Sequence, residues 1–184
     1  MKITLYSYCP NCGSKRLKQV TQQLQKCSAC DTSHYFNQRP CVGALIVQNK
    51  KMLLAKRTAM PYKGWWDIPG GFMDIDETPQ EAISREVKEE LGLHIEIQRF
   101  INFYPDTYNY KGVIVPLLSI YFSCGLKGNQ KIELSDELNA YNWFPLHDLP
   151  PNIAFKNARQ AIEDYLEGKF FWPVAICTLY CNFI

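Results

Sequence analysis

Residues 70–93 read GGFMDIDETPQEAISREVKEELGL, and this stretch predicts a helix with both of its ends marked. Thr78 and Glu81 form a capping box, with Pro79 at the first helical position. Gly92 suits a helix end, because glycine adopts the left-handed backbone conformation without strain. The sequence therefore predicts a helix over residues 79–91, whose buried stripe consists of apolar residues spaced four apart: Ile83, Val87 and Leu91.

A second stripe of the predicted helix is acidic. Glu86, Glu89 and Glu90 fall at positions i, i+3 and i+4, so their carboxylates share one face. Like charges arranged in this way repel, and a divalent hard cation would turn the repulsion into ligation. The alternative is a solvated acidic face on which Arg85 pairs with Glu89 one turn later. Helix spacing alone leaves both interpretations open.

Apolar runs on either side of this helix predict the strands of an α/β domain. They lie at 42–47, 52–55, 95–104, 113–122 and 142–145, and Asn49-Lys50 suits a hairpin turn between the first two. Apolar residues at helical spacing over 155–166 predict a second helix, which Gly168 would end. We expect an α/β domain over residues 39–168, preceded by a small module at 1–38 and followed by an apolar tail at 169–184.

Half of the eight cysteines form a metal-ligand pattern, C-x2-C, fourteen residues, C-x2-C: Cys9, Cys12, Cys27 and Cys30. Each C-x2-C turn directs two thiolates at one ion, so two such turns predict a closed tetrahedral zinc site. A ribbon this short buries too little surface to fold alone, so zinc would be part of its stability. The alternative is two reactive or disulfide-forming pairs.

Composition and charge exclude several classes of protein. The chain has 184 residues of which 47% are apolar, so it can fill a core, and wholesale disorder is excluded. Its net charge of +2 is too small to imply nucleic acid or an anionic membrane as a partner. Residues 1–9 lack the apolar segment of a secretory signal, so we expect a cytoplasmic protein. Residues 170–184 are uncharged but too short to span a membrane, and we expect them to dock on the body or form a homodimer contact.

Residues 71–93 resemble the Nudix box, G-x5-E-x7-R-E-U-x-E-E-x-G-U, in which U is aliphatic. All nine defined positions match at the required spacing: Gly71, Glu77, Arg85, Glu86, Val87, Glu89, Glu90, Gly92 and Leu93. The resemblance extends from Val42 through GWWDIPGG to Trp143, and the four-cysteine ribbon resembles a subgroup that includes NADH, FAD and ADP-ribose pyrophosphatases. It implies the Nudix fold, an α/β/α sandwich with a mixed sheet, preceded by a small zinc ribbon.

The resemblance also implies a reaction. Nudix hydrolases use Mg²⁺ or Mn²⁺ to hydrolyse a nucleoside diphosphate linked to another moiety, because cations neutralise the diphosphate and lower the pKa of the attacking water. The residues matched to the family's metal ligands are Glu86, Glu89 and Glu90, with the Gly71 carbonyl as a further ligand. Glu77 either binds the metal through water or buttresses the loop. Arg85 is expected to orient the glutamates through bidentate hydrogen bonds.

The general base and the substrate stay open at this point. Relatives supply the base either from the box, here Glu89, or from a loop acid, here Glu137. Arg57 is a candidate phosphate ligand, with a plain surface charge as the alternative. Phe72 and Tyr110 are candidates for stacking on a base, with ordinary packing as the alternative. The expected substrate is a nucleotide of the ADP-ribose, NADH or FAD type; the alternatives are dinucleoside polyphosphate hydrolysis and a catalytically silent nucleotide sensor.

Overall fold

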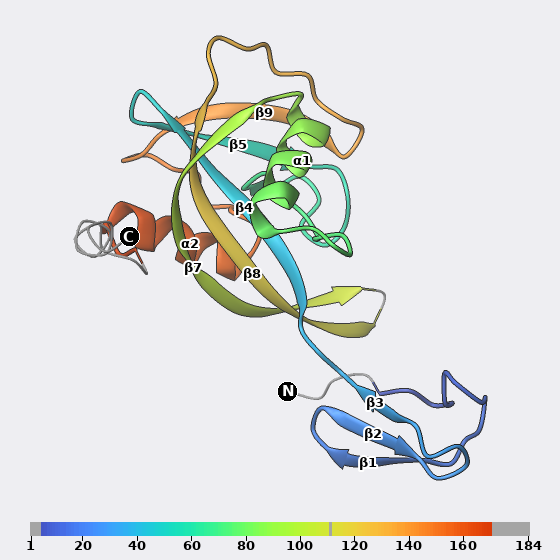
Figure 1. Ribbon diagram of the computed structural model, residues 1–184. Coiled ribbons are helices and arrows are strands. Elements are labelled where there is room, and N and C mark those ends of the chain that lie inside the picture. The colour runs from blue at the N-terminus through green and yellow to red at the C-terminus, as the bar shows by residue number, and fades with distance from the viewer. Residues whose placement is uncertain (1–4, 111, 171–184) are drawn as a thin grey trace, which may run out of the picture. The chain divides into compact units, whose positions relative to one another are not determined.

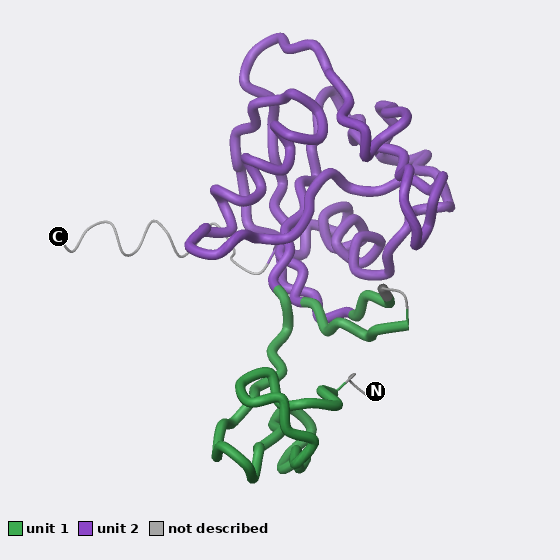
Figure 2. The backbone as a smooth tube through the Cα atoms, turned by 90° about the vertical axis from the view of Figure 1, so that its right-hand side faces the viewer, with its two compact units in different colours: residues 1–39, 107–117 green, residues 40–106, 118–184 purple. Residues whose placement is uncertain are grey.

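The computed structural model describes residues 5–110 and 112–170, and the chain divides into two compact units (Figure 1; Figure 2). One unit combines residues 1–39, which we call the ribbon, with residues 107–117. The other, which we call the larger unit, comprises residues 40–106 and 118–184. The predicted apolar tail, 169–184, lies outside the described residues except for its first two. Within the described ranges, no helix is long and apolar enough to cross a membrane.

The ribbon is a three-stranded antiparallel sheet with almost no apolar core. Its strands are β1 (Leu17–Thr21), β2 (Leu24–Cys27) and β3 (Ser33–Tyr35), in that spatial order. Among residues 5–39, the buried side chains are those of Cys9, Gln25 and Cys27. A module with so little buried apolar surface needs another source of stability. The cysteine pattern predicts that a metal ion provides it.

The larger unit is built on a six-stranded sheet in the order β6-β5-β4-β8-β7, with β9 paired antiparallel to β5. All five predicted strand segments lie inside strands of this sheet, and β6 is an addition to them. The strands are β4 (Arg39–Gln48), β5 (Lys51–Arg57), β6 (Trp66–Asp67), β7 (Ile95–Tyr110), β8 (Val113–Leu126) and β9 (Leu138–Pro145).

The predicted hairpin joins β4 to β5. Asn49 and Lys50 have φ angles of 51° and 60°, the left-handed conformation that a two-residue turn between antiparallel strands requires at both positions. Val47 pairs with Met52 directly across this turn. The local turn signal therefore sets the register of two strands that are buried on both faces.

Two helices cover opposite faces of the sheet (Figure 1): α1 (Pro79–Leu91) and α2 (Lys156–Leu166). Val87 of α1 shares one buried apolar cluster with Ile46 of β4. Ile162 of α2 shares a second cluster with Leu45, the neighbouring residue of the same strand. Because successive side chains of a strand point to opposite faces, these two clusters lie on the two sides of the sheet. The predicted α/β/α sandwich is confirmed.

Candidate active site and thiolate cluster

Helix α1 begins and ends where its local signals place it. The Glu81 N–H donates to the Thr78 hydroxyl at 3.3 Å, and the Thr78 N–H donates to the Glu81 carboxylate at 2.9 Å, which completes the capping box. At the other end, Gly92 has a φ of 70° and its N–H donates to the Lys88 carbonyl at 3.0 Å. The buried stripe, with Val87 at its centre, fixes the rotation of the helix and therefore the direction of its acidic stripe.

Arg85 donates hydrogen bonds to three carboxylates from one guanidinium. Its Nε and Nη2 donate to the two oxygens of Glu77 at 2.7 and 2.9 Å, a bidentate pair. Its Nη1 donates to Glu86 at 2.9 Å and to Glu89 at 3.0 Å. Its Nη2 also donates to the Phe72 carbonyl oxygen at 3.0 Å. Arg85 thus ties the acidic helix to the preceding loop, which is the arrangement expected for an orienting residue.

Glu77 is held in the loop by hydrogen bonds to both of its oxygens. Besides the pair with Arg85, its Oε2 accepts from the Asp74 N–H at 3.0 Å. The Arg85 hydrogen bonds, helped by the Asp74 N–H, lower the pKa of Glu77 to about 2. Of the two roles that the resemblance implied, these contacts favour buttressing of the loop over binding metal through water.

Glu86 and Glu90 form the least solvated part of the acidic stripe. The Glu86 side chain is 15% exposed, against 59% for Glu89. The Glu90 Oε2 accepts from the Gly70 N–H at 2.9 Å. Burial raises the pKa of Glu90 to about 8 and also raises that of Glu86, and the negative charges around both add to the effect. Crowded, partly desolvated carboxylate oxygens are a donor set that fits Mg²⁺ or Mn²⁺.

The two glycines before the helix allow the glutamates to approach the loop. A Cβ on Gly71 would lie 2.6–2.7 Å from the Glu86 carboxylate, and Gly70 has a φ of 149° that side chains rarely permit. The Gly71 carbonyl, predicted as a metal ligand, accepts from the Val42 N–H at 2.8 Å. The carbonyl therefore takes part in a backbone bond to β4, and its role as a ligand stays a prediction.

Glu137 lies in the loop before β9, and its carboxylate is exposed. Its negative charge raises the pKa of both Glu86 and Glu90, which places it near the acidic stripe although it is far away in sequence. Its carbonyl oxygen accepts from the Thr58 N–H at 3.1 Å and from the Thr58 hydroxyl at 2.7 Å. The structure thus brings Glu137 near Glu86 and Glu90, and the choice between Glu89 and Glu137 as general base stays a prediction.

Asp67 is a site residue that the sequence reasoning missed. Its side chain is 14% exposed, and partial burial raises its pKa to about 6 although it accepts from Arg57 Nη1 at 3.0 Å. The charge of Asp67 also raises the pKa of Glu90, so this carboxylate adjoins the acidic stripe. An acidic residue within the apolar stretch GWWDIPGG was the available signal.

The residues predicted to bind substrate have different surroundings. Arg57 pairs with Asp67, donates to the Pro61 carbonyl at 3.2 Å and lies over the Phe155 ring at 4.8 Å, so it is not a plain surface charge, and its role as a phosphate ligand stays a prediction. Phe72 adjoins the box glycines and is 45% exposed. Tyr110 is the last residue of β7, and its side chain lies outside the described part of the structure.

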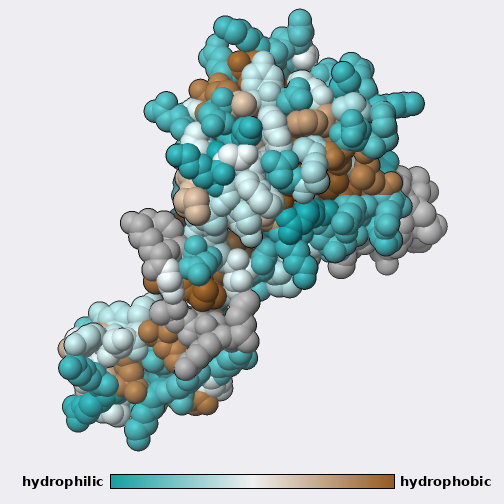
Figure 3. Space-filling view, turned by 180° about the vertical axis from the view of Figure 1, so that it is seen from behind, coloured by the Kyte–Doolittle hydropathy of each residue, from teal (hydrophilic) through white to brown (hydrophobic). Residues whose placement is uncertain are grey.

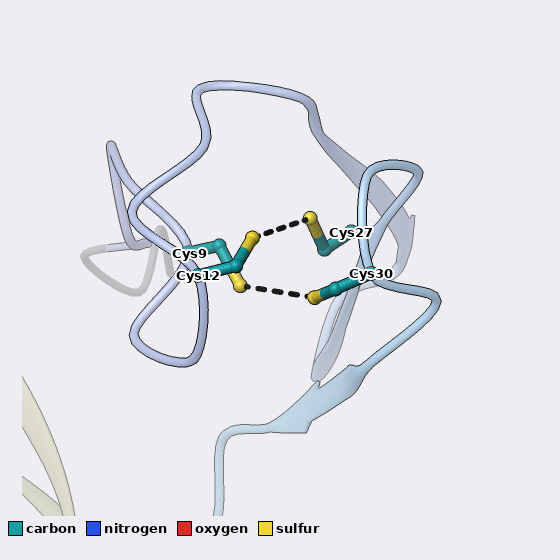
Figure 4. A group of neighbouring side chains, drawn as sticks. All are labelled: Cys9, Cys12, Cys27 and Cys30. Carbon is teal, nitrogen blue, oxygen red and sulfur yellow. Dashed lines mark hydrogen bonds between the residues drawn. The ribbon is translucent and has the colours of Figure 1, made fainter.

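The four ribbon cysteines point at one centre (Figure 4). Their sulfur atoms all lie within 4.8 Å of one another, with 3.7 Å between Cys9 and Cys30 and 3.8 Å between Cys12 and Cys27. A tetrahedral ion with metal–sulfur bonds of about 2.3 Å has sulfur–sulfur edges of about 3.8 Å. The cluster therefore fits a four-thiolate ion site, and none of the six cysteines in the described residues forms a disulfide.

Hydrogen-bond donors surround these sulfur atoms. The Cys30 sulfur lies 3.2 Å from the Thr32 hydroxyl, and hydrogen bonds from Thr32 lower the pKa of Cys30 to about 5, which favours the ligating thiolate. His34 Nε2 lies 3.2 Å from the Cys9 sulfur, a contact that the cysteine spacing alone did not indicate. Polar groups that donate to metal-binding thiolates orient them and stabilise their charge.

Comparisons with known proteins agree with this architecture. A family model described as the NUDIX domain matches residues 37–165. The NAD-capped RNA hydrolase NudC of Vibrio parahaemolyticus is 29% identical over 164 residues, which are 86% of this chain and 60% of that protein. The ADP-ribose pyrophosphatase of Methanocaldococcus jannaschii is 33% identical over 137 residues, 73% of this chain and 77% of that protein.

A solved structure and the lengths of the relatives complete the comparison. The crystal structure of a NUDIX hydrolase from Nitrosomonas europaea matches with a TM-score of 0.73 at 27% identity, over 88% of this chain and 91% of that one. This chain spans little more than half the length of the NudC relatives, 60% and 57% for two Vibrio proteins. The family model covers most of the chain, including the capped helix and its acidic stripe. The chain therefore belongs to the NUDIX domain family.

Proposed function

We propose that this chain is a metal-dependent hydrolase of nucleoside diphosphates linked to another moiety. The observation that carries the proposal is that every glutamate of the acidic stripe is held by a hydrogen bond: Arg85 donates to Glu86 and Glu89, and the Gly70 N–H donates to Glu90. These hydrogen bonds keep together acidic side chains that would otherwise repel. The relatives' names, which describe hydrolysis of NAD-capped RNA and of ADP-ribose, support the same reaction class.

The residues of this site would have separate roles in the reaction. Glu86, Glu89 and Glu90 would hold a divalent ion, Mg²⁺ or Mn²⁺, while Arg85 and the buttressing Glu77 keep those carboxylates in place. The bound ion supplies charge neutralisation at the diphosphate and lowers the pKa of the attacking water. Glu137 is the better candidate for general base, because Glu89 already accepts a hydrogen bond from Arg85.

The substrate class that the site supports best is a dinucleotide or nucleotide sugar of the ADP-ribose, NADH or FAD type. The diphosphate of such a substrate would bind the metal ion that the acidic stripe holds. The half-exposed ring of Phe72, beside the box glycines, offers a surface on which a base can stack. Hydrolysis would release a nucleoside monophosphate and the phosphorylated moiety. In the ribbon, we propose Zn²⁺ as the ion of the four thiolates, because closed four-cysteine sites are typical of structural zinc.

A substrate panel tests the proposal. Purified protein is incubated with ADP-ribose, NADH, FAD, dinucleoside polyphosphates and coenzyme A, with Mg²⁺, with Mn²⁺ or with a chelator. We expect release of a nucleoside monophosphate from at least one dinucleotide, which the chelator abolishes. Absence of turnover on the whole panel would favour a nucleotide sensor. If turnover is confined to dinucleoside polyphosphates, the proposed substrate class is wrong and the proposed type of reaction is right.

A further inference from the structure

The charge of the chain is divided unequally between its parts. Residues 1–39 contain six lysines and arginines and a single acid, Asp31, which gives the ribbon a net charge of +5. The remaining residues carry fourteen basic and seventeen acidic side chains, a net charge of −3. The small whole-chain charge of +2 is therefore an average over two opposite values. A basic module of this size is the electrostatic footprint of a polyanion-binding surface.

One face of the ribbon sheet concentrates this charge. Lys18 of β1 pairs directly with Lys26 of β2, and Lys26 pairs with Ser33 of β3, so these three side chains lie on the same face. Like charges directly opposite each other destabilise a sheet. Asp31 offsets part of that repulsion through an ion pair with Lys26 at 2.8 Å. Lys18 has no second acid within the ribbon sequence to pair with.

The same face carries an exposed aromatic ring. Tyr35 of β3 pairs with Leu24 of β2, two residues from Lys26, so its ring projects on the lysine side. Tyr35 is 69% exposed, which is unusual for a large ring in a sheet. The other face is covered, since Gln25 is buried and exchanges hydrogen bonds with the Tyr6 backbone. We call the uncovered side, formed by Lys18, Lys26, Ser33 and Tyr35, the lysine face.

A second pairing of basic and aromatic side chains occurs in the first cysteine turn. Lys15 Nζ lies 5.3 Å from the centre of the Tyr8 ring, and Tyr8 is 54% exposed. Hydrophilic side chains dominate the ribbon in Figure 3, with a few apolar ones among them. Exposed rings interleaved with lysines provide both of the interactions that sequence-independent binding of single strands requires: phosphate contacts and base stacking.

We propose that the lysine face of the ribbon binds single-stranded nucleic acid. Lysines meet the phosphates, and Tyr35 stacks on a base, which a duplex does not expose. An acidic peptide would satisfy the lysines and leave the ring without a planar partner. This inference does not depend on the hydrolytic function, because it concerns a surface formed by the ribbon alone. The small whole-chain charge gave no indication of it.

Fluorescence anisotropy with a short, labelled, uncapped RNA tests this proposal. The buffer contains a metal chelator that is too weak to remove the ion from the thiolate site. The full chain is compared with the double variant Lys18→Gln/Lys26→Gln, with Tyr35→Ala and Tyr35→Phe, and with the matched control Lys131→Gln/Lys156→Gln in the larger unit. Metal content of one ion per chain verifies that each ribbon variant is folded. Affinity is measured as a function of KCl concentration.

The lysine double variant is expected to reduce the slope of log K against log salt by about 1.4, since each phosphate contact to a single strand contributes about 0.7. Tyr35→Ala should weaken binding about tenfold without changing the slope, and Tyr35→Phe should restore it. The control pair should bind as the unchanged protein does. The proposal is wrong if the lysine double variant keeps the original slope, or if polyglutamate or blunt duplex RNA competes as well as the single strand.

Discussion

The ribbon and the larger unit arrange their candidate metal ligands in opposite ways. In the ribbon, the ligands are nearly the whole interior, because Cys9 and Cys27 are buried while the described residues around them supply no apolar core. In the larger unit, one of the two apolar clusters contains the buried stripe of helix α1 and fixes the helix, so the acidic stripe lies on its partly exposed side. A metal would hold the ribbon together, whereas the larger unit would hold its metal in place. Loss of the ion should therefore have different consequences in the two regions.

The largest effect is expected from Cys27→Ser. Removing one thiolate opens the closed site, and structural zinc sites of this kind contribute about 10 kcal/mol or more to folding. We expect the ion to be lost and the ribbon amides to lose protection from hydrogen exchange, while the amides of Leu53 and Val87 in the larger unit stay protected. Elemental analysis and hydrogen exchange measure both. Equal loss of protection in the two units would remove the distinction between them.

The next largest effect is expected from Glu90→Gln, which keeps the shape of the side chain and removes its charge. Turnover should fall about a thousandfold, since several kcal/mol of charge stabilisation depends on the ion. The matched control is Glu163→Gln, because Glu163 is an exposed residue of α2, and this variant should leave turnover unchanged. Steady-state kinetics at saturating Mg²⁺ or Mn²⁺ provide the measurement. Near-normal turnover of the Glu90 variant would remove this residue from the ligand set, and loss of the ribbon ion would show that the units are coupled.

A smaller change is expected from Glu137→Gln. Loss of a general base lowers turnover by about a hundredfold or more, and the concentration of Mg²⁺ that gives half-maximal rate should stay the same. Metal titrations of the initial rate separate the two effects. If the loop variant remains active, the base is Glu89; if the metal dependence shifts instead, Glu137 is a ligand.

The smallest effect is expected from Thr78→Ala, which removes one half of the capping box on α1. It should lower the free energy of unfolding of the larger unit by about 1 kcal/mol, and Thr78→Ser should restore most of the loss. Urea denaturation followed by tryptophan fluorescence measures this change. The ribbon should keep its ion throughout, so release of the ion by this variant would contradict the independence of the two units.

Much of this architecture could be predicted because its signals are local. Thr78, Pro79 and Gly92 mark the ends of α1, and the two C-x2-C turns mark the thiolate cluster, since each turn or cap is made within a few residues. The bounds of α1 and the two ligands that each cysteine turn supplies follow from such short-range rules. The strand positions followed from apolar runs, which report burial without reporting partners.

Contacts between segments that are distant in the chain could not be predicted from the sequence. Asp67 is significant only because its partly buried carboxylate accepts a hydrogen bond from Arg57 across β5 and β6. The Val42 N–H of β4 donates to the Gly71 carbonyl, a contact that the sequence did not indicate. His34 reaches Cys9 because β3 pairs with β2. Each of these depends on strand pairing, which residue spacing does not specify.

The central claim is that water attacks the diphosphate directly at the carboxylate site of the larger unit. A single turnover of ADP-ribose in oxygen-18 water, with enzyme in excess over substrate, tests it most directly. The account predicts that one of the two phosphorylated products carries heavy oxygen and that the enzyme is never phosphorylated. Unlabelled products after that first turnover, or a trapped phosphoryl-enzyme, would contradict it.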